Sequence, residues 1–351
     1  MECLIGKSTE QLEQLAASMQ QPALRGRQLA RWMYRRGVSS FDEMTDLPKS
    51  LRATLTNSFA VRAATVVGVT RSDDEVTKFA LRFPGLGYAE CVRMPSRGRT
   101  AVCVSTQIGC PVGCAFCASG QSGFHGNLTA GHIVEQVLTA LDSSDDDDIA
   151  QASVNVVYMG MGEPFLNYEH TVRSIRLLRT EMGIGARSIT VSTIGLPKRI
   201  RQFAEDEPQV NLAISLHAPT DKLRRQLIPR RCCPVRELLA AVRDYIALTN
   251  RRVSFEYVLM GGLNDGRSDA RRVGELLRDM LCHVNVIPYN ATGTDFRAPM
   301  RQRCAAFCEL LRQEGVNATL RASRGRGAEA ACGQLRARME AEDRAESAED
   351  A

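Results

Sequence analysis

No stretch of the 351-residue sequence contains the roughly 18 apolar residues that a membrane-spanning helix needs. The first residues, Met1–Lys7, carry neither the basic segment nor the apolar run of a secretory signal. Internal repeats and long linkers are also lacking. These absences argue against membrane, secreted and repeat proteins, so we expect a cytoplasmic globular protein with no membrane partner. An apolar content of 44% and charges of both signs are typical of that class.

The net charge of +5 alone says little about partners, but its distribution is more informative. Acidic residues concentrate at positions 145–148 and 340–346, so the rest of the chain is richer in arginine than the total suggests. Arginine pairs well with phosphate. Each arginine cluster taken singly fits a solvated face as well as a phosphate contact, whereas three together favour RNA or DNA. The clusters are Arg25/Arg27/Arg31/Arg35/Arg36, Arg224/Arg225/Arg230/Arg231 and Arg321/Arg324/Arg326.

Three of the twelve cysteines stand close together, as Cys110, Cys114 and Cys117. Three thiolates can ligate three corners of a 4Fe–4S cluster and leave the fourth iron open. A radical S-adenosylmethionine enzyme needs that open iron, because the amino acid end of S-adenosylmethionine chelates it. A structural zinc site would need a fourth ligand, and the chain has no second pair of cysteines two residues apart and no nearby histidine at zinc-finger spacing. The spacing therefore predicts the cluster, and the apolar Phe116 before the third cysteine agrees with it.

Five other cysteines lie in helical or strand-like contexts, and we interpret them as packing residues or surface thiols. They are Cys232, Cys233, Cys282, Cys304 and Cys308.

Apolar periodicity divides the chain into parts of different structure. Residues 8 to about 60 read as helical, because Ser8 and Gln11 have the spacing of a capping box and a second helix over 24–36 should end at Gly37. The arginine- and aromatic-rich face of this second helix fits a nucleic-acid surface as well as a packed helix with arginines reaching to solvent. We expect a helical accessory domain at 1–60, a β-rich connection at 61–100, a core at 101–338 and a disordered acidic tail at 339–351.

Strands and helices alternate through the core, which predicts a parallel sheet. Before this alternation begins, short strands separated by turn residues are expected at 63–69, 76–83, 88–94 and 100–105. The strands that alternate with helices are expected at 154–159, 188–192, 210–216, 252–259 and 283–287, with a last strand at 316–321. Helices are expected near 131–141, 168–182, 197–206, 234–248, 268–280 and 300–314. About six strand–helix units are fewer than a closed eight-stranded barrel has. The predicted fold is therefore α/β, an open partial (β/α)6 barrel of the radical S-adenosylmethionine type, with a small helical N-terminal domain and a short β extension.

Several suggestive residues follow the carboxyl ends of the expected parallel strands, where α/β folds gather their active groups. Glycine at 160 and 162 would let the backbone approach a ligand closely, and Glu163 could accept a bond from an ammonium. Taken alone, His217 is more often a structural histidine and Asn290 more often a turn residue. Their common placement predicts a cofactor pocket formed by Gly162, Glu163, Ser192, Ser215, Leu216, His217 and Asn290.

The chain closely resembles the RlmN/Cfr family of radical S-adenosylmethionine RNA methyltransferases. The matching segments span nearly the whole chain, and the one at 330–335 is specific to this family. They are Cys103–Cys110, Gly123–Thr129, Gly160–Pro164, Ser192–Gly195, Ser215–Pro219 and Ala330–Leu335, with Arg27–Tyr34 and Phe41–Pro48 in the accessory domain.

The resemblance implies a particular chemistry at an adenine carbon that is too weakly nucleophilic for direct methyl transfer. One S-adenosylmethionine methylates Cys332, and a second is cleaved at the cluster to a radical that activates this methyl group, so two are used per turnover. The methylene radical adds to the adenine ring, Glu90 accepts the ring proton, and Cys103 releases the product by forming a transient disulfide with Cys332. Cys91, next to Glu90, should point to the opposite strand face.

The resemblance also implies the partners. The substrate is carbon 2 of an adenosine in 23S ribosomal RNA, with transfer RNA left open as a second substrate. The electron comes from an external donor such as flavodoxin, the accessory domain binds RNA, and the protein is a monomer.

Some segments depart from the family pattern near the substrate. Residues 325–329 stand where family members commonly have an acidic segment before the cysteine that corresponds to Cys332. Ala291 stands where proline is usual, and the loop 292–299 is short. These departures leave open methylation of carbon 8, as in the Cfr branch. More distant alternatives are a radical activase, which would need neither Cys332 nor Cys103, and a non-catalytic RNA-binding iron–sulfur protein.

Overall fold

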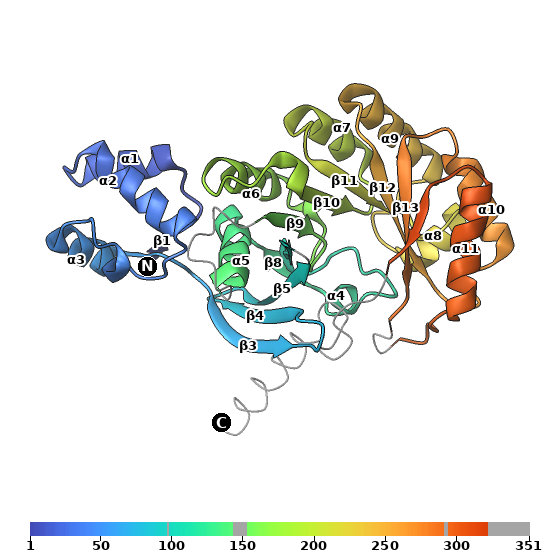
Figure 1. The fold of residues 1–351 in the computed structure, drawn as a ribbon, viewed down its shortest axis with the longest axis horizontal. Helices are drawn as coiled ribbons and strands as arrows, with labels where there is room; N and C mark the ends of the chain where they lie inside the picture. The colour runs from blue at the N-terminus through green and yellow to red at the C-terminus, as the bar shows by residue number, and fades with distance from the viewer. Residues whose placement is uncertain (97, 143–152, 291–293, 322–351) are drawn as a thin grey trace, which may run out of the picture.

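A computed structural model describes residues 1–96, 98–142, 153–290 and 294–321 (Figure 1). One ten-stranded sheet organises these residues, and seven of its strands are joined by parallel pairing. In the order of the sheet these are β14 (Ala318–Leu320), β13 (Cys282–Pro288), β12 (Val253–Leu259), β11 (Asn211–Ser215), β10 (Ile189–Thr193), β9 (Val154–Tyr158) and β6 (Arg99–Cys103). The antiparallel strands β5 (Gly87–Ser96), β4 (Thr77–Phe83) and β3 (Thr65–Arg71) extend the sheet beyond β6.

The sheet curves into a barrel that stays open. Strands β14 and β3 are the two ends of the strand order, and the described residues contain no pairing between them. Helices follow the parallel strands and cover the outer face of the sheet (Figure 1). They are α5 (Ala130–Asp142), α6 (Tyr168–Thr180), α7 (Pro197–Asp206), α9 (Val235–Thr249), α10 (Arg267–Leu277) and α11 (Arg301–Gln313). The short helix α8 (Asp221–Leu227), which also follows β11, instead packs against the residues around Val112. The open partial barrel of six strand–helix units with a β extension is confirmed.

Side chains of the central strands alternate between a helix-covered core and the barrel interior. In β9 and β10, Val156 and Val191 are fully buried in the main apolar core, whereas Val157 and Ser192 are only partly buried. Because successive side chains of a strand point to opposite faces, the second set lines the interior of the barrel. This interior is where the sequence placed its candidate site.

The N-terminal segment forms a small helical unit beside the barrel. Helix α1 (Thr9–Ser18) begins with the predicted reciprocal capping box between Ser8 and Gln11. Helix α2 (Ala23–Ala30) continues as the π-helical turn η1 (Arg31–Arg35) and the chain turns away at Gly37, whose φ is +67°. The short 3-10 helix η2 (Phe41–Glu43) and helix α3 (Lys49–Ser58) follow, and β1 (Glu2–Cys3) pairs in parallel with β2 (Phe59–Ala60).

Polar contacts fasten this unit to the end of α6. The Thr9 hydroxyl donates to a Glu181 carboxylate oxygen at 2.6 Å, and Arg35 Nη1 donates to the carbonyl of Met182 at 3.0 Å. Figure 1 shows the unit at one end of the molecule, beside α5 and α6. The second predicted helix is thus a packed helix, with Tyr34 fully buried and arginines on its outer side.

The ten expected strands are the ten strands of the sheet, and their ends agree within two residues. A short hairpin and several helical turns were not predicted, because three to seven residues are too few to show a period. They are β7 (Gln107–Gly109) with β8 (Phe124–Asn127), α4 (Ala118–Gln121), α8, η4 (Pro164–Leu166) and η5 (Ala186–Ser188). No described helix has the length and apolar content to cross a membrane. The predicted tail at 339–351 lies outside the described residues.

Candidate cofactor and active site

The β7–β8 hairpin holds the loop that carries the three cysteines. The backbone N–H of Cys110 donates to the carbonyl of Gly123 at 2.8 Å, closing the base of the loop. Gly109 has φ +71°, and a Cβ there would lie 1.9 Å from the Gly123 carbonyl oxygen. On the far side, the N–H of Ala115 donates to the carbonyl of Leu227 at 2.9 Å, tying the loop to α8. The loop is therefore fixed at both sides by backbone bonds.

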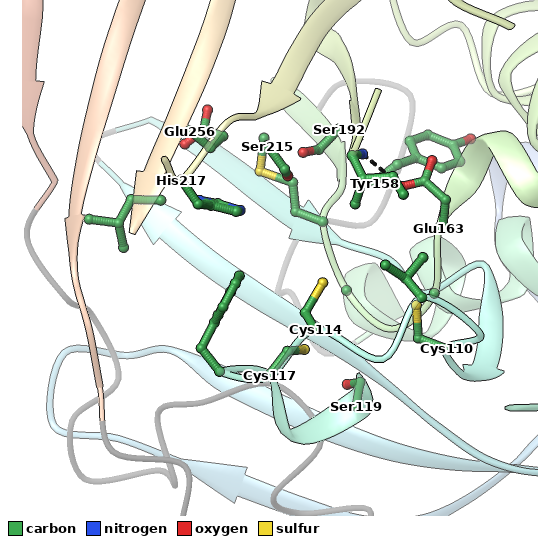
Figure 2. Close-up of a pocket in the computed structure, with 17 residues that line it drawn as sticks. Cys110, Cys114, Cys117, Ser119, Tyr158, Glu163, Ser192, Ser215, His217 and Glu256 are labelled. Atoms are coloured by element: carbon green, nitrogen blue, oxygen red, sulfur yellow. Dashed lines mark hydrogen bonds between the residues drawn. The ribbon is translucent and has the colours of Figure 1, made fainter. Parts of the chain in front are cut away.

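Cys110, Cys114 and Cys117 all line one cavity inside the barrel, at the carboxyl ends of its strands (Figure 2). Burial raises the pKa of Cys110 to about 12 and that of Cys114 well above its usual value, although the N–H groups of Val112 and Gly113 oppose the first shift. Buried thiols of this kind become thiolates when a metal centre displaces their protons.

Three such thiols on one wall fit a 4Fe–4S cluster, whose irons are held by separate thiolates. In the described ranges, no group of three His, Cys, Asp or Glu side chains converges to hold a single metal ion, whereas a 4Fe–4S cluster needs each thiolate on a separate iron. No disulfide joins two of the described cysteines.

The glycine-rich segment after β9 forms the adjoining wall. Gly162 has φ +99°, and a Cβ at this position would lie 2.7 Å from the Gln107 side chain. Glu163 is 3% exposed, and its two carboxylate oxygens accept from the backbone N–H groups of Phe165 at 2.9 Å and Ile194 at 2.8 Å. Burial raises the pKa of Glu163 to about 7. Glu163 therefore lines the cavity as predicted, and the backbone before it, at Gly162, packs closely against Gln107.

His217 lies across the cavity from Glu163 (Figure 2). It has φ +56°, a strained conformation for a residue other than glycine. Its Nδ1 accepts from the backbone N–H of Val258 at 3.1 Å, and its ring packs edge-on against Phe116, with centroids 4.9 Å apart. Burial lowers the pKa of His217 to about 3, so the ring is neutral and carries its proton on Nε2. A ring so held presents one N–H donor to the cavity.

The other predicted pocket residues divide into two groups. Ser192 and Ser215 line the cavity with Gly162, Glu163 and His217. Leu216 does not, since its side chain is fully buried in the main apolar core. Asn290, which is exposed two residues after β13, is also not among the described residues that line the cavity.

Arg224 corrects our reading of the second arginine cluster as a solvated face or phosphate contact. Its side chain is fully buried, and its guanidinium donates to the carbonyls of Ile194 and Ser215 and to the carbonyl of Cys233 at 3.0 Å. These bonds join the ends of β10 and β11 to the segment after α8. Arg224 is therefore a structural residue that holds in place the backbone of Ile194 and Ser215, two residues that line the cavity.

Sequence reasoning missed Glu256, a second buried carboxylate in the cavity. It lies on β12 and is 4% exposed. Asn285 Nδ2 donates to its Oε1 at 2.8 Å, while its Oε2 is buried without a hydrogen-bond partner among the described residues. The sequence did contain a signal for Glu256, since a carboxylate in the middle of an apolar strand is rarely buried unless it has a partner.

Glu90 and Cys103 lie on the same face of the sheet. Cys103 pairs directly with Val92, two residues after Glu90 on β5, so the two side chains are diagonal neighbours. Both are buried, and Lys78 Nζ lies 3.8 Å from Glu90 Oε2 on that same face. Cys91 points to the other face, where its thiol lies 3.6 Å from the carbonyl of Gln136, as predicted. Cys332 lies outside the described residues.

Known proteins are similar to this chain over nearly its whole length. A family model described as the ribosomal RNA large subunit methyltransferase N-terminal domain matches residues 3–61, and the radical SAM superfamily model matches residues 104–272. Proteins named probable dual-specificity RNA methyltransferase RlmN are similar over nearly their whole length. That of Rippkaea orientalis is 42% identical over 96% of this chain and 98% of its own, and that of Gloeobacter violaceus is 44% identical over 95% of each.

A solved structure is similar over the same extent. The crystal structure of a radical SAM methyltransferase from Sphaerobacter thermophilus has a TM-score of 0.91 at 44% identity, and the match covers 95% of this chain and 99% of that one.

Proposed function

The chain belongs to the RlmN family of radical S-adenosylmethionine RNA methyltransferases, and we propose that it methylates carbon 2 of an adenosine in 23S ribosomal RNA, with transfer RNA as a second substrate. The matched N-terminal family model is named for the large ribosomal subunit, which supports ribosomal RNA. The dual specificity in the names of the relatives supports a second RNA substrate. The resemblance in sequence favours carbon 2 over carbon 8.

The single observation that carries this proposal is the cavity in which three cysteines face a glycine-rich wall, two serines and a neutral histidine. Cys110, Cys114 and Cys117 would hold the cluster, and Gly162, Glu163, Ser192, Ser215 and His217 would bind S-adenosylmethionine. The backbone of Leu216 and the side chain of Asn290 stay predicted contacts. When bound, the cluster passes on an electron from an external donor, and two S-adenosylmethionine molecules per turnover supply the methyl carbon and the means to activate it.

The residues of the chain then have distinct tasks. Cys332 carries the methyl group and bonds to the RNA base, and Glu90 accepts the proton that leaves the ring. Cys103 forms a disulfide with Cys332 and so releases the methylated product. The common sheet face of Glu90 and Cys103 supports this assignment, because both must reach the same base.

The accessory unit supplies an RNA-contacting surface in this proposal. Arg27, Arg31 and Arg35 stand four residues apart on one side of α2 and η1 and line a groove at the junction with α6. Guanidinium groups at this spacing can follow a phosphate backbone. Arg31→Gln should lower RNA affinity at low salt and reduce the salt dependence of binding by about one counterion.

The decisive test is to identify the product and trap the intermediate. Ribosomal RNA methylated by the purified, cluster-loaded enzyme should yield 2-methyladenosine on digestion to nucleosides. Cys103→Ala should leave RNA covalently attached to Cys332, because no thiol remains to release it. Finding only 8-methyladenosine would contradict the position of methylation, and normal turnover by Cys103→Ala would contradict its role.

A further inference from the structure

Glu256 is a buried carboxylate in the cofactor cavity that the proposed chemistry does not use. Its backbone lies in β12 between two neighbouring strands, paired with Ser215 of β11 on one side and Asn285 of β13 on the other. Directly paired residues share a sheet face, so these three side chains form a row across the interior of the barrel. Ser215 and Glu256 both line the cavity, and Figure 2 shows them on the same wall.

The two oxygens of this carboxylate are in different situations. Oε1 accepts from Asn285 Nδ2 at 2.8 Å, which fixes the orientation of the group. Oε2 is buried with no hydrogen-bond partner in the described parts of the chain. A buried polar atom without a partner costs about 1–3 kcal/mol, and more when it is charged. Burial accordingly raises the pKa of Glu256. A ligand that donates hydrogen bonds to Oε2 would remove this cost.

The position of Glu256 decides which part of the ligand it meets. The other carboxylate of the cavity, Glu163, lies on the opposite side in Figure 2, and its oxygens already accept from two backbone N–H groups. In the proposed function the amino acid end of S-adenosylmethionine lies at the cysteines. Glu256 is on the wall made by β11 and β12, where the nucleoside part must lie.

The nucleoside offers one group that suits a carboxylate next to a serine hydroxyl. The two ribose hydroxyls are adjacent donors, and a buried carboxylate is a common partner for a ribose hydroxyl in nucleotide-binding proteins. We propose, on the basis of the proposed function, that Glu256 Oε2 accepts a hydrogen bond from the ribose hydroxyls of S-adenosylmethionine, with Asn285 positioning the carboxylate. This makes Glu256 a specificity residue for the ribose.

The test measures binding rather than methylation. Calorimetry on the anaerobic, cluster-loaded protein without reductant would give the affinity for S-adenosylmethionine and for its 2′-deoxy and 3′-deoxy analogues. The wild-type protein should bind at least one deoxy analogue about 10- to 100-fold more weakly than S-adenosylmethionine, the loss expected when a buried acceptor is left unpaired. Glu256→Gln keeps the shape, and it should bind S-adenosylmethionine about 10-fold more weakly and discriminate less than about 3-fold against the same analogue.

Two controls make the result specific. Glu163→Gln should lower the affinity for all three ligands but keep the discrimination between them, because Glu163 is assigned to the other end of the molecule. Iron content and thermal unfolding of each variant report the fold. If Glu256→Gln loses iron, Glu256→Asp serves instead, since it keeps the charge but withdraws the oxygen by one methylene and should weaken discrimination.

Full discrimination by a folded Glu256 variant would overturn the proposal. A Glu256→Gln protein that loses discrimination only against an N6-methylated adenine would also overturn it, by assigning the carboxylate to the base. The assay needs no RNA, so an error in the proposed RNA target or ring carbon leaves it unaffected. A wild-type protein that does not bind S-adenosylmethionine would contradict the proposed function itself and this inference with it.

Discussion

Glu163 should cause the stability of the protein to fall as the pH rises between its two pKa values. Burial raises the pKa of this carboxyl from 4.5 in the unfolded chain to about 7 in the folded one. Between these values the folded chain keeps a proton that the unfolded chain has released, so the free energy of unfolding decreases with rising pH. One pKa unit corresponds to about 1.4 kcal/mol, so full ionisation costs the folded state about 3.4 kcal/mol.

Glu163→Gln isolates this contribution, because glutamine keeps the shape and does not ionise. Urea unfolding of both proteins without S-adenosylmethionine, at about pH 5 and about pH 8, gives the difference in the free energy of unfolding. From the lower to the higher pH, the free energy of unfolding of the wild type should fall by about 2.5 kcal/mol relative to that of Glu163→Gln. Glutamine can accept only one of the two backbone bonds of Glu163, which changes the difference by about 1 kcal/mol at both pH values.

The pH dependence contributed by the other buried groups cancels in the difference between the two proteins. Burial lowers the pKa of His217 to about 3, so His217 increases the free energy of unfolding as the pH rises towards the pKa of an unfolded histidine. This contribution is the same in both proteins. A difference between wild type and Glu163→Gln that is constant within about 0.5 kcal/mol would refute the reasoning, because it would mean that burial does not disfavour the ionised carboxyl. A change of the opposite sign would mean that its hydrogen bonds outweigh its burial.

Three further outcomes follow from the packing around the site. Gly109→Ala should lose most of the bound iron, because its Cβ would meet a carbonyl oxygen at 1.9 Å, whereas Gly85→Ala, with φ +75° and nothing within 4 Å, should keep the full iron content in a colorimetric assay. Arg224→Met should lower the free energy of unfolding by about 3–5 kcal/mol in urea, since it leaves buried carbonyls without donors; a loss under 1 kcal/mol would contradict this role. Lys78→Met should destabilise the protein by about 3 kcal/mol, because it removes a buried positive charge 3.8 Å from the Glu90 carboxylate, and adding Glu90→Gln to Lys78→Met should recover much of that loss. Equal stability of the single and the double variant would show that the pair is not coupled.

Local sequence signals were sufficient for most of the fold. Parallel strands covered on the outside by helices contain long apolar runs, and all ten strands could be placed from those runs and the turn residues between them. The Ser8–Gln11 capping box is a contact within four residues, so the sequence specifies it almost completely. The β7–β8 hairpin escaped prediction because its three- and four-residue strands are shorter than any usable period.

Arginine shows the limit of reading single side chains. Arg224 and Arg225 are adjacent in the sequence and looked equivalent there, yet Arg224 is fully buried and Arg225 is exposed. What separates them is the presence of carbonyl groups from β10, β11 and the segment after α8 around the first guanidinium. Those carbonyls come from residues up to thirty positions away, so no local pattern could reveal them.

The sequence by itself determined the cysteine loop, because the spacing of Cys110, Cys114 and Cys117 is a property of one short segment. Only the tertiary structure decided which distant side chains share the interior of the barrel. Glu256 meets Asn285 and Ser215, and Glu90 lies diagonal to Cys103, because the strands pair in one register. A shift of that register by one residue would turn each of these side chains to the helix-covered face. Pairing across the whole sheet sets the register, and no single segment of the chain contains that information.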